Sequence, residues 1–351
     1  MGSYSPQRIY EARFAWSPFK EATYNAAWND AKLTHSCQPL GFDPPAIGRD
    51  FRSDAGKAWG GSDRATTRAV VRQNIAYSVN VELSALLFAQ IAAFCHGVCE
   101  TIELAPGPPA AYQHTITFLD PLVDGLNLPS TRHWYKTAPD LGTKVKGATC
   151  SGYTIQYTQS QAIVQLNSNW LGSGDYTSGD IASVPSLDTD AIMGTLFEKD
   201  LAIWLEPPGA TVDIRERIAA FSLEVGNGIA DSPRFFAGTG VYAGRAWQGK
   251  TTINPALTVF AKDVDDIRTL IEGDTVQELK LIWTGDTITG TYKFSISIDI
   301  PALHFGNAEK IGATERFVTH DLAPGDEGVF KPTGEPITIV VVNKEPLFLT
   351  A

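Results

Sequence analysis

The chain has 351 residues, of which 43% are hydrophobic and only 19% charged. Soluble domains usually carry roughly 25% charged residues, so this composition argues against disorder and indicates some surface that a partner covers. With 28 basic and 39 acidic residues, the net charge is −11. That balance argues against a protein that grips nucleic acid, because phosphate binding needs clustered Lys and Arg. The 31 Gly and 21 Pro favour short strands joined by turns.

Residues 1–70 are punctuated by Pro and Gly and show no long periodic run, which predicts an irregular arm that is disordered or docks on neighbours. Residues 75–81 then alternate apolar and polar, the period-two pattern of a half-buried strand. Apolar residues recur every three or four positions over residues 83–96, and Gly97 follows. This pattern predicts an amphipathic helix that packs one apolar stripe on a sheet and ends at the glycine.

Further strands follow from the same alternation. In the first half we expect strands at residues 113–118, 153–158 and 162–167, a long loop over residues 120–147 and a linker over 171–190. In the second half we expect strands at 201–205, 218–225, 257–261, 278–283, 294–300 and 337–342. We also expect a helix at 264–271, a turn at 286–290, and Pro301 as the end of the preceding strand.

Both halves place an alternating strand directly before one short helix. The strand patterns predict a mainly β protein, and this similarity predicts a module that is duplicated within the chain, with one short helix per module. Chance recurrence of a common β-α-β order is the competing explanation. The predicted organisation is an N-terminal arm at 1–70, a first β-rich module at 71–190 and a second one at 191–351.

Catalytic and metal-binding patterns are weak. Cys95 and Cys99 flank His96, but no second Cys or His pair has matching spacing, so a buried thiol at a helix end is the better explanation. Gly238, Gly240 and Ala243 fit a dinucleotide-binding pattern, but the helix start that such a site needs does not follow. The sequence has no phosphate loop or nucleophile elbow. We therefore expect no enzyme, no cofactor and no metal site.

The order of these segments resembles the major tail tube proteins of long-tailed bacteriophages. Seven segments are each similar to a strand, helix or loop of that family, and the resemblance covers most of residues 65–351. The segments are residues 76–97, 111–118, 128–130, 147–153, 197–227, 292–301 and 334–343. The resemblance implies the tail tube fold, in which packed β-sheets flanked by a helix form rings. The rings are usually six-fold, and a duplicated module would allow three subunits instead.

The same resemblance implies a structural virion protein that self-assembles into stacked rings, made in the host cytoplasm and located in the phage tail. The implied partners are copies of itself, a tape measure protein, and tail terminator and baseplate or tail-tip proteins. Double-stranded DNA would pass through an acidic lumen without specific binding. The candidates for ring-to-ring contact, chosen from the expected 120–147 loop, are Pro129, Arg132, Trp134 and Tyr135.

Two other functions compete with this one. The eight Trp and eleven Tyr could stack on sugars in a monomeric carbohydrate-binding or adhesin-like β-sandwich, although core packing explains aromatic residues equally well. A hydrolase with a pair of carboxylates would need a local motif that singles out two Asp or Glu residues, and we find none.

Overall fold

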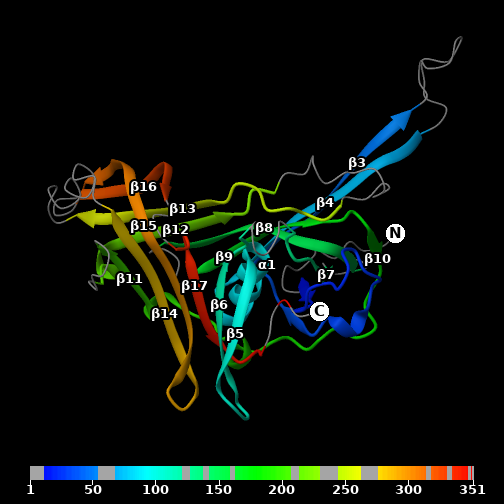
Figure 1. Ribbon diagram of the computed structural model, residues 1–351, viewed down its shortest axis with the longest axis horizontal. Coiled ribbons are helices and arrows are strands. Elements are labelled where there is room, and N and C mark those ends of the chain that lie inside the picture. Colours follow the sequence, from blue (N-terminus) through cyan, green and yellow to red (C-terminus); the bar gives the residue numbers. More distant parts are fainter. Residues whose placement is uncertain are drawn as a thin grey trace, which may run out of the picture.

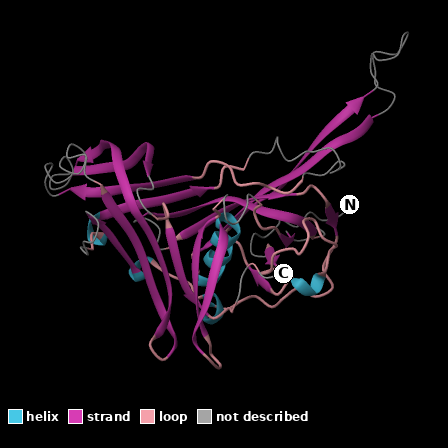
Figure 2. Cartoon of the chain, viewed as in Figure 1, coloured by secondary structure: helices cyan, strands magenta, loops and turns pink. Residues whose placement is uncertain are grey.

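The computed structural model describes residues 12–53, 68–120, 127–136, 142–158, 163–206, 213–229, 244–261, 276–313, 318–329, 334–346 and 349. Over these residues the protein is mainly β, as predicted (Figures 1 and 2). The strands are β1 Arg13–Trp16, β2 His35–Cys37, β3 Gly41–Ser53, β4 Arg68–Glu82, β5 Gly97–Ala105, β6 Ala111–Phe118, β7 Thr131–Lys136, β8 Thr143–Thr158, β9 Gln165–Gly172, β10 Tyr176–Ser178, β11 Leu201–Glu206, β12 Ile218–Gly226, β13 Thr252–Ala261, β14 Gln277–Thr289, β15 Tyr292–Ala313, β16 Val318–Val329 and β17 Thr338–Asn343. The α-helices are α1 Ala85–His96 and α2 Asp190–Met193, and the 3-10 helices are η2 Asp30–Lys32, η3 Glu198–Asp200 and η4 Arg215–Arg217.

The strands form two large antiparallel layers that share one long strand. The first layer has the order β3-β4-β9-β8-β12-β13-β16 and continues into the second half of β15. The second layer has the order β11-β14-β15-β17-β6-β5. In Figure 1 the β14–β15 and β5–β6 hairpins run down beside each other. A smaller sheet pairs β2, β1, β7, the first part of β8, and β10.

Helix α1 lies between the two large layers and contacts β8 on one side and β5, β6 and β17 on the other. All twelve of its residues are buried, so the expected single apolar stripe is wrong. The helix ends as predicted, at Gly97, which takes the left-handed conformation at φ 95°. It begins two residues later than expected, where the Ser84 hydroxyl accepts a hydrogen bond from the backbone amide of Leu87. Phe88 meets Tyr153 edge to face across the interface, with ring centroids 5.5 Å apart.

The predicted module boundary at residues 190 and 191 is crossed by sheet pairing. Strand β12 pairs with β8, and β17 pairs with β6, so strands of both halves build common sheets. The expected linker at 171–190 contains the end of β9 and the short strand β10. The second predicted helix, residues 264–271, lies outside the described residues, so the comparison of two strand–helix units stays a prediction.

Three further expectations are corrected by the structure. The arm at 1–70 contributes β1, β2 and β3, with Phe14 of β1 paired to Cys37 of β2. The expected loop at 120–147 contains β7 and the start of β8. Strand β15 continues through Pro301, because the pairing with β14 shifts register there: Leu279 faces Ile300, and Gln277 faces Leu303. A bulge tolerates proline, since the missing N–H need not join the ladder.

Strands β3 and β4 extend beyond the body of the protein. Residues 75–82 of β4 pair with β9, whereas residues 68–74 pair only with β3 within the described part of the chain. Figure 1 shows the resulting two-stranded ribbon projecting away from both layers at the upper right. An isolated two-stranded ribbon is marginally stable in water. A partner that packs against it would therefore stabilise it.

Candidate functional site

The described residues contain no group of three or more His, Cys, Asp or Glu side chains that could hold a metal ion. Four histidines are buried among polar and aromatic partners, and one of them, His35, lies 3.0 Å from Asp188; the other three are His96, His114 and His133. Burial lowers the pKa of His96 and of His133 to about 3 and that of His114 to about 4, so all three are neutral at physiological pH. Their ring nitrogens lie 2.6 to 3.0 Å from hydroxyl or amide oxygens of neighbouring strands, which gives them a packing role.

The four cysteines are free thiols. Burial raises the pKa of Cys37 to about 12 and that of Cys99 to about 11, whereas a nucleophilic cysteine needs a lowered pKa. Cys95 lies inside α1, as expected for a buried thiol near a helix end, and burial raises its pKa too. The dinucleotide-like pattern at residues 238–243 lies outside the described residues.

The tryptophans are mostly interior. Trp16, Trp134, Trp170 and Trp283 are buried in the core. Among the tryptophans that the structure describes, Trp247 alone is counted as exposed, at 48%. The buried rings form part of the packing between strands and layers, for example Phe221 of β12 against Trp283 of β14 at 5.9 Å.

The four residues predicted for ring-to-ring contact lie together on or just before β7, but mostly inside the protein. Pro129, Arg132 and Trp134 are buried, and Tyr135 is half-buried. Trp134 packs with Ala15, Leu33 and Ile181 in a small second core. Because buried side chains cannot contact another ring directly, their position indicates an internal role for this strand.

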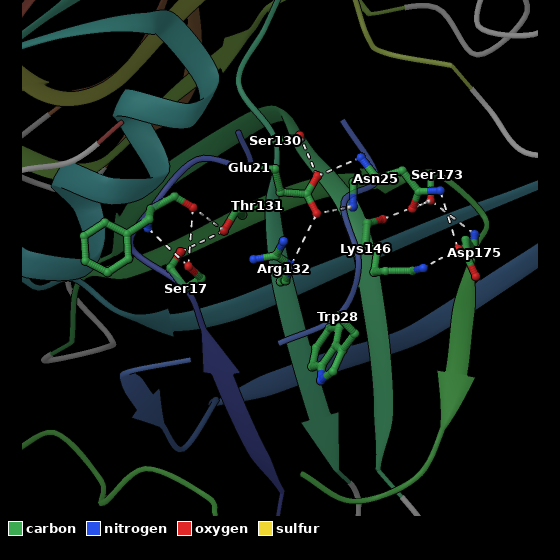
Figure 3. A network of polar contacts seen from close by, with 12 residues as sticks. Ser17, Glu21, Asn25, Trp28, Ser130, Thr131, Arg132, Lys146, Ser173 and Asp175 are labelled. Atoms are coloured by element: carbon green, nitrogen blue, oxygen red, sulfur yellow. Dashed lines mark hydrogen bonds and ion pairs between the residues drawn. The ribbon is translucent and has the colours of Figure 1, made fainter. Parts of the chain in front are cut away.

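That internal role centres on Glu21, whose side chain is 0% exposed (Figure 3). One carboxylate oxygen accepts hydrogen bonds from the Ser130 hydroxyl at 2.8 Å and from the backbone amide of Asn25 at 3.0 Å. The other accepts one from the Gly147 amide at 3.3 Å and lies 3.6 Å from Nε of Arg132. The carboxylate thus joins three separate pieces of chain: its own segment, β7 and β8.

Burial is the largest influence on this group and raises the pKa of Glu21, while its hydrogen bonds and Arg132 act in the opposite direction. Desolvation of the charged form therefore outweighs its stabilisation by these partners. The side chain of Glu21 therefore has a structural role: its hydrogen bonds contribute more to the stability of the fold than its charge does.

A second set of contacts extends the attachment on either side of Glu21. The Thr131 hydroxyl donates to the carbonyl of Ser17 at 2.8 Å, and the Ser17 amide donates to the carbonyl of Arg132 at 3.1 Å. Toward β10, the Ser173 hydroxyl donates to Oδ1 of Asn25 at 2.9 Å. Lys146 and Asp175 form an ion pair beside it (Figure 3). Residues 17–25 are therefore attached to the smaller sheet along their whole length.

Sequence reasoning missed Glu21. Arg132 was singled out as a ring-to-ring contact and not as a partner of Glu21, and no local pattern distinguishes one carboxylate among 39 acidic residues. The nearest available signal is that Glu21 lies in a polar, turn-rich stretch directly after the apolar run of β1.

The open edges of the two layers are the other candidate functional surfaces. In the described residues, β5 pairs only with β6, so its second edge is open. Ile102 in the middle of β5 is 57% exposed. The opposite edge strand, β11, is partly covered by its own chain: the Ile214 amide donates to the carbonyl of Ile203 at 2.7 Å. An open edge that presents an exposed isoleucine is a ready template for another strand.

The outward face of the second layer is polar and rich in hydroxyl groups. Along β15 the outward side chains are Ser295, Ser297 and Asp299, and along β6 they include Thr115 and Thr117. Lys280 of β14 lies on the same face, and its amino group pairs with Glu278 and lies 3.8 Å from Asp299. In the described residues this face therefore carries hydroxyls, a lysine that is paired with carboxylates, and Lys293 at the exposed start of β15.

No helix in the described part of the chain has the length and apolar character needed to cross a bilayer. No protein-family model matches the sequence, and no curated protein is significantly similar to it.

Proposed function

We propose that the chain is the major tail tube subunit of a long-tailed bacteriophage, a structural protein that self-assembles into stacked rings around the channel through which DNA passes. The observation that carries this proposal is the projecting β3–β4 ribbon together with the open edge of β5. Within the described residues, both features leave a strand edge whose backbone groups are not paired with another strand. Head-to-tail closure of a ring supplies a partner to every copy and leaves no free edge.

The packed sheets and the buried helix are compatible with this assembly. The family fold is a pair of packed β-sheets with a helix, and the two layers around α1 have this composition. The shared strand β15 ties the layers together, so that one copy forms a rigid wall segment. Pairing of such segments at their edges would give a continuous tube.

The charge distribution also supports a DNA-conducting channel. DNA binds proteins mainly through Lys and Arg that neutralise its phosphates, and the net charge here is −11. The hydroxyl-rich outward face of β6 and β15 is our candidate for the channel wall. Of the lysines on this face, Lys280 is paired with Glu278, and Lys293 lies exposed at the start of β15. Two separate lysines, one of them paired, would be too few to hold a phosphate backbone that must slide past.

The test is assembly of the purified protein, followed by negative-stain microscopy and by sedimentation at increasing concentration. The wild-type chain is expected to form rings and hollow tubes whose length grows with concentration. In Ile102→Lys an added charge at the open edge of β5 blocks strand addition. Tubes should be lost while the free energy of unfolding changes by no more than about 0.5 kcal/mol, the usual range for surface substitutions.

The matched control is Phe197→Lys, which places the same charge at an exposed position outside the strands, with 40% of the residue exposed. This variant should assemble as the wild type does. A wild-type protein that stays a monomer at every concentration, even with tail tips added as seeds, would refute the proposed function. Normal tubes from Ile102→Lys would remove β5 from the assembly interface.

A further inference from the structure

A pocket of about 400 Å³ opens where strands of the first layer face the edge strand of the second. Its lining includes Tyr157 near the end of β8, Ile218 at the start of β12, and Leu201 and Ile203 of β11. The three aliphatic residues are buried, with at most 4% of each exposed. The pocket therefore has an apolar wall that could pack against a hydrocarbon stem.

The hydroxyl of Tyr157 is the buried polar group of this pocket. Only 3% of the residue is exposed, and its ring packs against Phe221 with centroids 5.9 Å apart. Within the described part of the chain the hydroxyl forms no hydrogen bond. Burial and the nearby carboxylate of Glu198 raise the pKa of Tyr157, so the hydroxyl keeps its proton. A buried hydroxyl without a partner destabilises the fold, and a ligand that hydrogen-bonds to it offsets this cost.

Four charged side chains line the pocket, two cations and two carboxylates. The cations already have partners, because Nε of Arg215 lies 3.2 Å from a carboxylate oxygen of Asp213, and the amino group of Lys199 lies over an aromatic ring, 5.8 Å from its centroid. Glu198 and Glu216 are exposed and form no ion pair with another described residue. The charge that the pocket has left to offer is therefore negative.

We propose that this pocket binds a short aliphatic amine as its ammonium ion. The ammonium group donates hydrogen bonds to Glu198, Glu216 and the oxygen of Tyr157, and the alkyl stem packs on the aliphatic wall. An ammonium group has three donors and no acceptor, which matches three acceptors at the pocket. An anion would be repelled by both carboxylates, and a neutral stem would leave all three acceptors unused. The inference is independent of the proposed function.

The experiment uses the purified full-length chain and saturation-transfer NMR, which detects weak ligands of single copies and of large assemblies alike. n-Butylamine at neutral pH is the probe, and n-butanol is the control with the same stem and no charge. Butylamine is expected to bind with a Kd of about 1 mM, which the affinity ceiling allows for a ligand this small. Butanol should bind at least about tenfold more weakly, because it lacks the charge that the carboxylates attract.

Two variants test the assigned contacts. Glu216→Gln should weaken butylamine binding about fivefold, the upper range for an exposed ion pair. Tyr157→Phe should also weaken it about fivefold, while the ligand-free protein keeps its thermal stability, since the hydroxyl has no hydrogen bond to lose within the described residues. The matched control is Glu224→Gln, which removes a carboxylate at an exposed position of β12 outside the pocket. It should leave the Kd within about 1.5-fold of the wild type, because solvent and salt screen exposed charges.

Three results would overturn the proposal. The first is the absence of saturation transfer up to about 20 mM butylamine, or a Kd for butylamine equal to that for butanol. The second is an affinity of Glu216→Gln or Tyr157→Phe equal to that of Glu224→Gln. The third is a lysine with blocked backbone groups that binds about tenfold more tightly than butylamine, since this would assign the pocket to a protein side chain.

Discussion

Replacement of Glu21 by alanine tests whether the N-terminal segment is held by this one buried carboxylate. The change leaves three donors without their acceptor: the Ser130 hydroxyl and the amides of Asn25 and Gly147. Each buried donor that loses its partner costs about 1–3 kcal/mol, although some of the three will find water once the side chain is gone. The loss also leaves Arg132 without its ion-pair partner, and breaking a buried pair costs about 3–5 kcal/mol.

These contributions overlap, so we expect Glu21→Ala to lower the free energy of unfolding by about 3–5 kcal/mol. The measurement is denaturant unfolding at neutral pH, with the midpoint and slope fitted separately. Glu21→Gln is the informative comparison, because it keeps the shape and one acceptor oxygen but removes the charge. Glutamine also leaves Arg132 without its ion-pair partner, but it keeps an acceptor oxygen, and desolvation already outweighs the charge interactions and raises the pKa of Glu21. The glutamine variant should therefore lose about 1–2 kcal/mol less than the alanine variant.

The reasoning fails if alanine costs less than about 1 kcal/mol, the net worth of a single ordinary hydrogen bond. It fails in a different way if glutamine is as damaging as alanine. In that case the charge of Glu21 would hold the segment, and the hydrogen bonds would be secondary.

Two further predictions concern pH and the end of α1. Because the pKa of Glu21 is raised by burial above its usual 4.5, the folded state retains a proton that the unfolded state has lost. Its contribution to stability is complete below pH 4.5 and is lost as the pH rises through the raised pKa, so wild-type stability should fall relative to Glu21→Gln over that window. Gly97→Ala should cost about 2–4 kcal/mol in thermal or denaturant unfolding, since φ is +95° and a Cβ would lie 2.5 Å from Leu119. Gly107→Ala, at φ +97° in open space, should cost only the backbone strain of about 1–2 kcal/mol; equal losses at both glycines would show that contact with Leu119 does not matter.

The strands that the sequence predicted well are those with one buried and one outward face. Strand β17 alternates strictly between buried and half-buried residues, as does the first part of β15 around Ile296 and Ile298. Period-two alternation reports this geometry directly. Strand β7 escaped notice because Thr131 to Trp134 are buried on both faces, which removes the alternation. Strands β1 and β2 are only four and three residues long, too short for any period to show.

The candidate site was harder to predict for a physical reason. The hydrogen bonds of Glu21 join residues 109 and 126 positions apart in sequence, and such contacts leave no local pattern. Arg132 shows the same limit: it was chosen as part of an expected surface loop, whereas it lies in β7, where the ion pair with Glu21 allows it to be buried. Long-range pairing of this kind becomes visible only once the smaller sheet is assembled.

The attachment of residues 17–25 bears on the proposed assembly. The smaller sheet and the β3–β4 ribbon meet through β4, β9 and β8, and Arg49 of β3 donates a hydrogen bond to the Tyr176 hydroxyl of β10 at 2.8 Å. The Glu21 network fixes β7, β8 and the turn before β10 to one another. The base of the ribbon therefore rests on a sheet that these contacts hold together, while its outer strands pair only with each other as far as the structure describes the chain. Because its base is held in place, the ribbon can offer its unpaired strand edges to a neighbouring copy in one fixed direction. Regular addition of identical subunits requires such a fixed direction.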